Sequence, residues 1–236
     1  MLPRSWRLAL LATLTAVFAT VVVIPSGNAG AVTRPLVSVI GDSYTAAWGA
    51  VVARNPPTTA GAWWRTTAAD LGWTPRTIVA NPGGGFVDKG ALGTFAQGLQ
   101  ANPLDPKTNY VLVQGGVNDS GQSPAAVLTG VRDLLALIKK QAPKAVVIVV
   151  GGFLPAPSKV TANYVQVARA IGDTRAIGTT RYLSGFLCSF TTNADLLHPD
   201  AAGHVTIGHY VAKRIKTGLD NGDDLHRDST GTFFTV

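Results

Sequence analysis

The sequence contains one cysteine, few charged residues and only one long apolar run. Cys188 has no second cysteine to pair with, so no internal disulfide can form and the fold must be stabilised by its core alone. Charged residues make up 14% of the chain and hydrophobic residues 46%, a balance that excludes an intrinsically disordered protein. The 236 residues are enough for one domain with a substantial core.

Dense basic segments are also missing, although the net charge is +7. Lysines and arginines are scattered, and only Lys139-Lys140 and the segment from Lys213 to Lys216 form small clusters. A nucleic-acid groove would need a denser patch with interleaved aromatic side chains. We therefore expect solvated helix faces and no nucleic-acid partner, while weak attraction to an anionic envelope or membrane surface stays open.

The one long apolar run lies at the N-terminus. Arg4 and Arg7 precede an apolar stretch from Leu8 to Ile24, and Ala29-Gly30-Ala31 has the small residues of a cleavage site. This order predicts a secretory signal peptide over residues 1–31. An uncleaved anchor is the alternative, because the run is near the shortest length that spans a bilayer. No cysteine lies at the end of the run, which excludes a lipoprotein anchor, and we expect a secreted or envelope-associated protein.

Beyond residue 31, short apolar segments alternate with segments of helical spacing. Strands are predicted at 37–40, 76–79, 110–113, 145–150 and 181–183, and helices at 43–52, 60–71, 123–141, 159–171 and 200–219. Ser123 and Pro124 supply the N-cap and the first position of the third helix. Strands separated by helices imply an α/β fold, a three-layer α/β/α sandwich with a parallel sheet. We expect one domain over residues 32–220, followed by a tail over residues 221–236.

A serine and a possible base follow predicted strands. Ser43 comes just after the first strand, so its hydroxyl lies at the carboxyl end of the sheet, where open α/β folds collect their chemistry. A serine alone is a poor nucleophile and needs a base. Asp195 precedes His198 by three residues, so its carboxylate can accept the imidazole Nδ1 proton and leave Nε2 free for a serine proton. The alternative for this pair is a helix cap and an ordinary loop histidine.

Groups suited to binding an oxyanion follow two other strands. Acyl transfer builds negative charge on a carbonyl oxygen, and preorganised N–H groups must face that oxygen. The glycines of Gly83-Gly84-Gly85 allow the backbone to approach closely, and Asn118 offers a side-chain N–H. Plain turns are the alternative interpretation for both segments.

These residues form four blocks that resemble, in order, the motifs of the SGNH (GDSL-type) hydrolase family of serine esterases and lipases. The blocks are Gly41-Asp42-Ser43, the glycine run within residues 81–86, Gly116-Val117-Asn118-Asp119 and Asp195-Leu196-Leu197-His198-Pro199. The glycine block departs from the spacing that is common in the family. The resemblance implies a flavodoxin-like parallel sheet and a chemistry that requires neither a cofactor nor a metal.

The resemblance also assigns roles to residues. It implies a catalytic triad in which Ser43 is the nucleophile, His198 the base and Asp195 its partner. Its oxyanion donors would be the Ser43 N–H, the Asn118 side chain and one glycine amide, Gly84 first and Gly85 next. The expected activity is hydrolysis of a carboxylic ester, either a lipid ester or an acylated polysaccharide, by a monomer.

The sequence also leaves other functions to consider beside ester hydrolysis. An O-acyltransferase would use the same triad. A non-catalytic carbohydrate-binding protein is suggested by four tryptophans, which are more often core or pocket walls: Trp48, Trp63, Trp64 and Trp73. Zinc binding is disfavoured because His198, His204 and His209 lack H-x-x-x-H spacing. A classical α/β-hydrolase would need G-x-S-x-G, and a dinucleotide-binding fold would need glycines between the first strand and helix.

Overall fold

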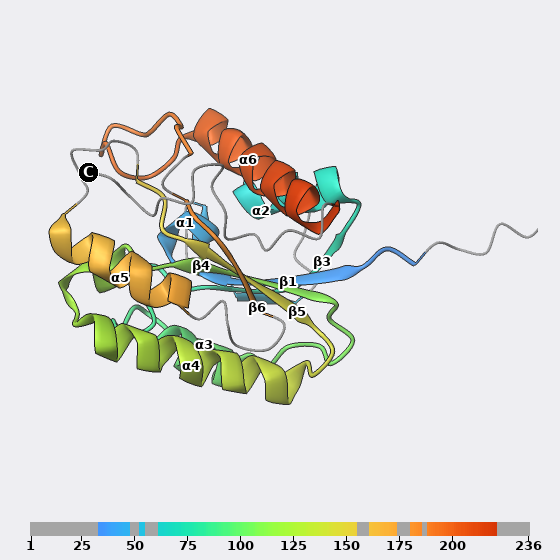
Figure 1. Ribbon diagram of the computed structural model, residues 1–236. Coiled ribbons are helices and arrows are strands. Elements are labelled where there is room, and N and C mark those ends of the chain that lie inside the picture. Colours follow the sequence, from blue (N-terminus) through green and yellow to red (C-terminus); the bar gives the residue numbers. More distant parts are fainter. Residues whose placement is uncertain are drawn as a thin grey trace, which may run out of the picture. The chain divides into compact units, whose positions relative to one another are not determined.

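The computed structural model describes residues 33–47, 52–54, 61–154, 161–173, 180–185 and 188–220 (Figure 1). The residues from Arg34 onward belong to one unit. The predicted signal peptide, residues 1–31, and the predicted tail, residues 221–236, lie outside the described residues.

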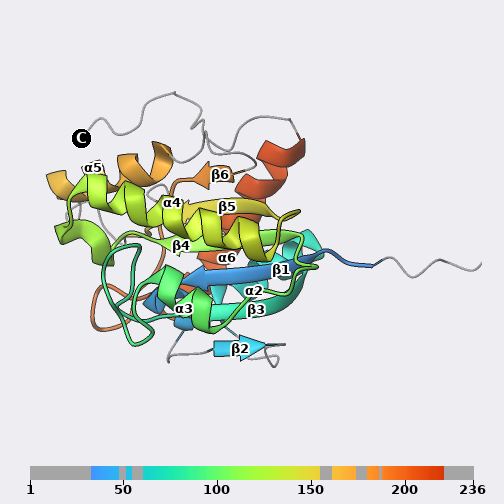
Figure 2. The same cartoon turned by 90° about the horizontal axis from the view of Figure 1, so that it is seen from below.

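Six strands form one sheet in the order β2-β3-β1-β4-β5-β6. Their bounds are β1 (Leu36–Gly41), β2 (Val52–Arg54), β3 (Thr74–Ala80), β4 (Tyr110–Gly115), β5 (Val146–Gly151) and β6 (Thr180–Leu183). Five strands are parallel, and β2 pairs antiparallel with β3 at the edge, as Figure 2 shows. The chain leaves β1 for one neighbour, β3, and then crosses to the other, β4. Ligands of open α/β sheets bind at such a switch point, outside the carboxyl ends of the strands.

Helices cover both faces of the sheet (Figure 1). One face carries α1 (Ser43–Ala46), α2 (Trp63–Leu71) and α6 (Ala201–Asp220), and the other carries α3 (Phe95–Ala101), α4 (Pro124–Gln141) and α5 (Ala162–Gly172). Alternate side chains of a strand point to opposite faces, so Val39 packs in one core cluster and Ile40 in the other. The predicted three-layer α/β/α sandwich is confirmed.

Local sequence signals predicted several elements correctly. The Ser123 hydroxyl accepts the Ala126 N–H, and α4 begins at Pro124 and ends at Gln141, as its cap and apolar spacing predict. Among the tryptophans suggested for carbohydrate binding, Trp63, Trp64 and Trp73 are buried in the core. Trp48 lies outside the described residues.

Other elements differ from the prediction. The first helix stops at Ala46, because Ala47 adopts a left-handed conformation (φ 42°), and the short strand β2 stands where its end was expected. The sequence analysis missed α3, although Thr94 and Gln97 form a capping box that marks its start. It also missed the 3₁₀ turn η1 (Asn118–Gly121). No helix within the described residues combines the length and the apolar character needed to cross a membrane.

Candidate active site

Ser43 is the first residue of α1 and is separated from β1 by one residue, so it lies at the carboxyl end of that strand. The preceding Asp42 is the N-cap, and its Oδ1 accepts the Tyr44 N–H at 2.9 Å. A Cβ atom at Gly41 would collide with the Thr45 side chain and lie 2.9 Å from the Gln114 carbonyl oxygen. The turn therefore needs glycine where β1 meets α1, and it holds Ser43 at the switch point.

The loop before α6 brings the predicted base to this serine. The Ser43 Oγ and His198 Nε2 atoms are 2.9 Å apart, although the two residues are separated by 155 positions. On the other side of the ring, His198 Nδ1 lies 2.7 Å from Asp195 Oδ2. The loop is closed by the Asn193 N–H, which donates to the His198 carbonyl oxygen. The structure thus brings all three residues of the predicted triad together.

The ionisation of Asp195 determines which ring nitrogen of His198 carries the hydrogen. The Asp195 Oδ1 atom accepts the backbone N–H groups of Leu197 and His198, each at 2.9 Å. The Leu197 N–H first, then the His198 ring and the His198 N–H, lower the pKa of Asp195 to about 2. An ionised carboxylate only accepts hydrogen bonds, so Nδ1 of His198 carries the hydrogen. Its Nε2 is then the acceptor for the Ser43 hydroxyl.

Asn118 and the glycine run also meet, but through a contact that the sequence did not predict. The Asn118 Nδ2 atom donates to the Gly84 carbonyl oxygen at 2.8 Å, and its second hydrogen remains available. The Gly84 N–H donates to the Asn81 carbonyl oxygen and the Gly85 N–H to that of Asp88, both at 2.9 Å. Either glycine amide would therefore serve an oxyanion as a shared, three-centre donor or after its loop bond opens.

Two buried side chains hold the glycine loop, and the sequence analysis gave them no such role. Asp119 accepts the N–H groups of Phe86, Val87 and Asp88 at 2.9–3.0 Å. Asn81 accepts the Leu92 N–H and donates to the Gly93 carbonyl oxygen. The available signal was a polar residue placed just after a buried strand, in both cases at the carboxyl edge of the sheet.

A second buried carboxyl, that of Asp42, belongs to the turn that carries Ser43. Asp42 is 1% exposed, and its Oδ2 accepts the Gln114 Nε2 hydrogen at 3.3 Å, while the Gln114 Oε1 accepts the Thr45 hydroxyl. Burial raises the pKa of Asp42 to about 7, against the opposing effect of its hydrogen bonds to Tyr44 and Gln114. Its contacts are those of a turn-shaping residue.

The two other histidines of the described residues, His204 and His209, have different surroundings. His209 Nδ1 pairs with Asp70 Oδ2 at 2.6 Å, between α6 and α2, and His204 is buried. Within the described ranges, no group of three or more histidine, cysteine or acidic side chains is arranged to hold a metal ion.

Comparison with known families identifies the chain. The family model of the GDSL-like lipases and acylhydrolases matches residues 39–205, which include Ser43, Asn118, Asp195 and His198. The chain belongs to this family. The matched residues run from β1 into α6 and therefore include most of the sheet and of the flanking helices described above. No curated protein matches it.

Solved structures resemble the GDSL-like domain in fold. A family 2 carbohydrate esterase with a carbohydrate-binding domain, from Corynascus thermopiles (Myceliophthora fergusii), has a TM-score of 0.60 at 20% identity, covering 80% of this chain and 67% of that one. A putative arylesterase from Agrobacterium tumefaciens has a TM-score of 0.59 at 19% identity, covering 78% and 99%.

A family two carbohydrate esterase from Clostridium thermocellum, in complex with cellohexaose, has a TM-score of 0.57 at 18% identity. The match covers 79% of this chain but only 65% of that one, so the GDSL-like chain spans less than two thirds of its length. At these identities the likeness is one of fold.

Proposed function

We propose that this chain is an exported serine esterase that cleaves carboxylic esters through a Ser43–His198–Asp195 triad and an acyl-enzyme. The observation that carries the proposal is the pair of contacts at His198, 2.9 Å from Nε2 to Ser43 Oγ and 2.7 Å from Nδ1 to Asp195 Oδ2. Such a series of hydrogen-bonded side chains activates a serine that would otherwise be a poor nucleophile.

In the proposed reaction, His198 Nε2 takes the Ser43 hydroxyl proton while Oγ bonds to the ester carbonyl carbon. The tetrahedral intermediate collapses, the bond to the alcohol oxygen breaks, and His198 returns its proton to the leaving alcohol. Water then attacks the acyl-enzyme with His198 again as the base, which releases the acid and restores Ser43. Asp195 stays ionised throughout and stabilises the imidazolium form.

The proposed oxyanion donors are the Ser43 N–H, the second hydrogen of Asn118 Nδ2 and an amide of Gly84 or Gly85. Asn118 suits this role because its hydrogen bond to the Gly84 carbonyl oxygen fixes the side-chain amide without using both hydrogens. The Asn118 amide, held in this way before the reaction, needs no reorganisation when the charge develops.

The proposed substrate is an acylated carbohydrate, with a lipid ester as the other candidate of the same reaction class. Carbohydrate esterases among the structures of similar fold support testing acylated glycans first. Export rests on the layout of residues 1–31, which would place the enzyme outside the cell or at its envelope.

The first experiment replaces the nucleophile and compares two histidine–aspartate pairs. Ser43→Ala and His198→Asn are each expected to lower kcat/KM on p-nitrophenyl acetate by about 10³-fold or more. His209→Asn and Asp70→Asn, which remove a pair of similar geometry outside the site, should leave it within about twofold. Intact-mass analysis should show a fluorophosphonate adduct on the wild type and none on Ser43→Ala. Full hydrolysis by Ser43→Ala would overturn the proposal.

The substrate class is tested separately. The wild type is compared on acetylated oligosaccharides and on p-nitrophenyl esters from acetate to dodecanoate, with released acid and transferred acyl groups both measured. Faster release of acetate from glycans than cleavage of the long esters is expected. The reverse order would point to a lipid ester, and transfer to a sugar hydroxyl in place of hydrolysis would point to an acyltransferase.

A further inference from the structure

Tyr44 follows the proposed nucleophile and reaches across to the loop that carries the proposed base. Its hydroxyl donates to the carbonyl oxygen of Leu197, the residue just before His198, at 2.8 Å. Its backbone N–H donates to Asp42 Oδ1 at 2.9 Å. One residue is thus hydrogen-bonded on both sides of the contact between Ser43 and His198.

The tyrosine ring has a fixed place in the core. It is 1% exposed and lies between three rings, with centroid distances of 5.6 Å to His198, 6.2 Å to Phe153 and 6.2 Å to Phe190. Tight packing on several sides restricts the side chain to one rotamer, so the position of the hydroxyl is well defined. Burial raises the pKa of Tyr44 well above its ordinary value, which keeps the hydroxyl protonated and able to donate.

The loop that carries His198, residues 193–199 and called the base loop here, is mostly exposed or only half-buried. The side chains of His198 and Asp195 are 36% and 47% exposed, and the bonds of Asp195 to Leu197, to the His198 N–H and to the His198 ring lie within the loop. Across the described part of the chain, two hydrogen bonds join this loop to α1: Ser43 to His198 and Tyr44 to Leu197. During the reaction the first is broken and remade, because the serine proton leaves.

We propose that Tyr44 is a positioning residue that sets the distance of His198 from Ser43 by fixing the Leu197 carbonyl. The inference rests on the proposed triad and adds a residue outside it. When Oγ becomes bonded to the substrate, the Tyr44 bond is the one that still ties the loop to α1. A misplacement of a catalytic group by about 1 Å can lower the rate by about 10²-fold.

The test is Tyr44→Phe, which removes only the hydroxyl oxygen and keeps the ring packing. The expected result is a fall of about tenfold in kcat on p-nitrophenyl acetate, with KM within about twofold, because an interaction needed for the reaction and not for binding is lost. The rate at which a fluorophosphonate labels Ser43 should fall by a similar factor.

The matched control is Tyr210→Phe. The Tyr210 hydroxyl also donates to a backbone carbonyl oxygen, that of Ser184, at 2.8 Å, but this bond joins α6 to the residue after β6 and does not involve the base loop. Each variant loses one partly buried tyrosine hydrogen bond, so both should lose a similar amount of thermal stability. Only Tyr44→Phe should lose kcat and labelling rate.

Each outcome decides something different. If Tyr44→Phe keeps the wild-type kcat and labelling rate while its Tm falls like that of Tyr210→Phe, the hydroxyl is merely structural and the inference is wrong. If KM rises and kcat does not change, Tyr44 acts on binding and the inference is also wrong. Failure of the proposed function would show elsewhere, as full activity in Ser43→Ala.

Discussion

At the scale of single residues, Leu196 adopts the left-handed backbone conformation that gives the base loop its shape. It lies between Asp195 and His198, its φ is +55°, and its side chain is 64% exposed. The left-handed turn lets one oxygen of Asp195 accept two backbone N–H groups while the other reaches the imidazole. Left-handed conformations cost a non-glycine residue about 1–2 kcal/mol. The cost falls on a residue whose side chain has no group that can form a hydrogen bond.

Substitutions at Leu196 test whether the backbone or the side chain matters. Leu196→Val adds a β-branched residue in the left-handed region and should lower the free energy of unfolding by about 1 kcal/mol and kcat severalfold. Leu196→Gly suits that region and should keep kcat within about twofold. Urea unfolding and initial rates on p-nitrophenyl acetate give both quantities. Equal kcat for the valine variant, with a loss for the glycine variant, would mean that the side chain contacts the substrate.

At the scale of elements, two side chains hold the connection from β3 to α3. One lies at the start of the connection and the other lies in a different element. Asn81, at the end of β3, bonds Leu92 and Gly93, and Asp119, in η1 after β4, bonds three successive N–H groups. The same 3₁₀ turn holds Asn118 against the Gly84 carbonyl oxygen. The two candidate oxyanion segments therefore form one hydrogen-bonded unit at the carboxyl ends of β3 and β4.

Graded substitution of Asp119 tests this unit. Asp119→Ala leaves three N–H groups without their acceptor and should lower the free energy of unfolding by about 2–4 kcal/mol. Asp119→Asn keeps an oxygen for Val87 and Asp88 and loses the bond to Phe86, so an intermediate value is expected. Hydrogen exchange of these three amides should rise in the same order.

Asp133→Ala is the control for these variants, because Asp133 is exposed on α4 and its loss should change stability by less than about 0.5 kcal/mol. Unchanged amide exchange in Asp119→Ala would show that the loop keeps its shape without the carboxyl group.

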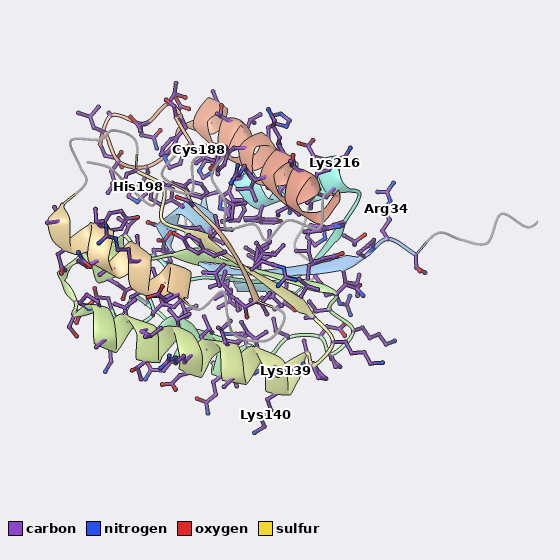
Figure 3. The ribbon with its side chains drawn as sticks, in the orientation of Figure 1. Arg34, Lys139, Lys140, Cys188, His198 and Lys216 are labelled. Carbon is purple, nitrogen blue, oxygen red and sulfur yellow. The ribbon has the colours of Figure 1, made fainter. Side chains whose placement is uncertain are left out.

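At the scale of the whole molecule, the labelled basic residues lie away from the candidate active site. His198 lies where the strands end, and the labelled cations Arg34, Lys139 and Lys216 lie toward the end at which β1 begins (Figure 3). Lys139 and Lys140 occupy the last turn of α4, where positive charge is favourable, and both are exposed. Lys213 and Lys216 are likewise exposed on α6, so both basic clusters lie on solvated helix surfaces, as expected.

One buried carboxyl should give the whole domain a measurable pH dependence. The pKa of Asp42 rises from 3.8 to about 7 on folding, so the native state binds this proton more tightly than the unfolded state. Its stabilising contribution is present below about pH 4 and is lost as the pH rises through about 7. Asp42→Asn keeps an N-cap oxygen and cannot ionise.

The measurement is the urea midpoint of wild type and Asp42→Asn at about pH 5 and about pH 8. The urea midpoint of the variant should rise relative to that of the wild type as the pH rises, because only the wild type must bury a charge. Burial also lowers the pKa of His204 to about 4, which opposes the trend at acid pH, but both proteins carry His204 and its effect cancels. Parallel pH profiles would mean that Asp42 is not the source.

Local patterns in the sequence predict the layers, most of the strands and helices, and the order of the blocks that carry the family resemblance. Apolar periodicity and local caps such as Ser123 are readable because they act between neighbours in the chain. The sequence also placed Ser43, Asn118 and the glycines near one edge, since the carboxyl ends of parallel strands lie together.

Several contacts across that edge become visible only in the folded protein. Examples are the bonds that engage the Gly84 and Gly85 amides, and the hydrogen bonds that Tyr44 and Asp119 form with distant backbone. A single hydrogen bond between segments far apart in the chain leaves no periodic pattern in either segment. Its partners become fixed when the sheet aligns the strands, and this is why the supporting residues of the site emerged only from the fold.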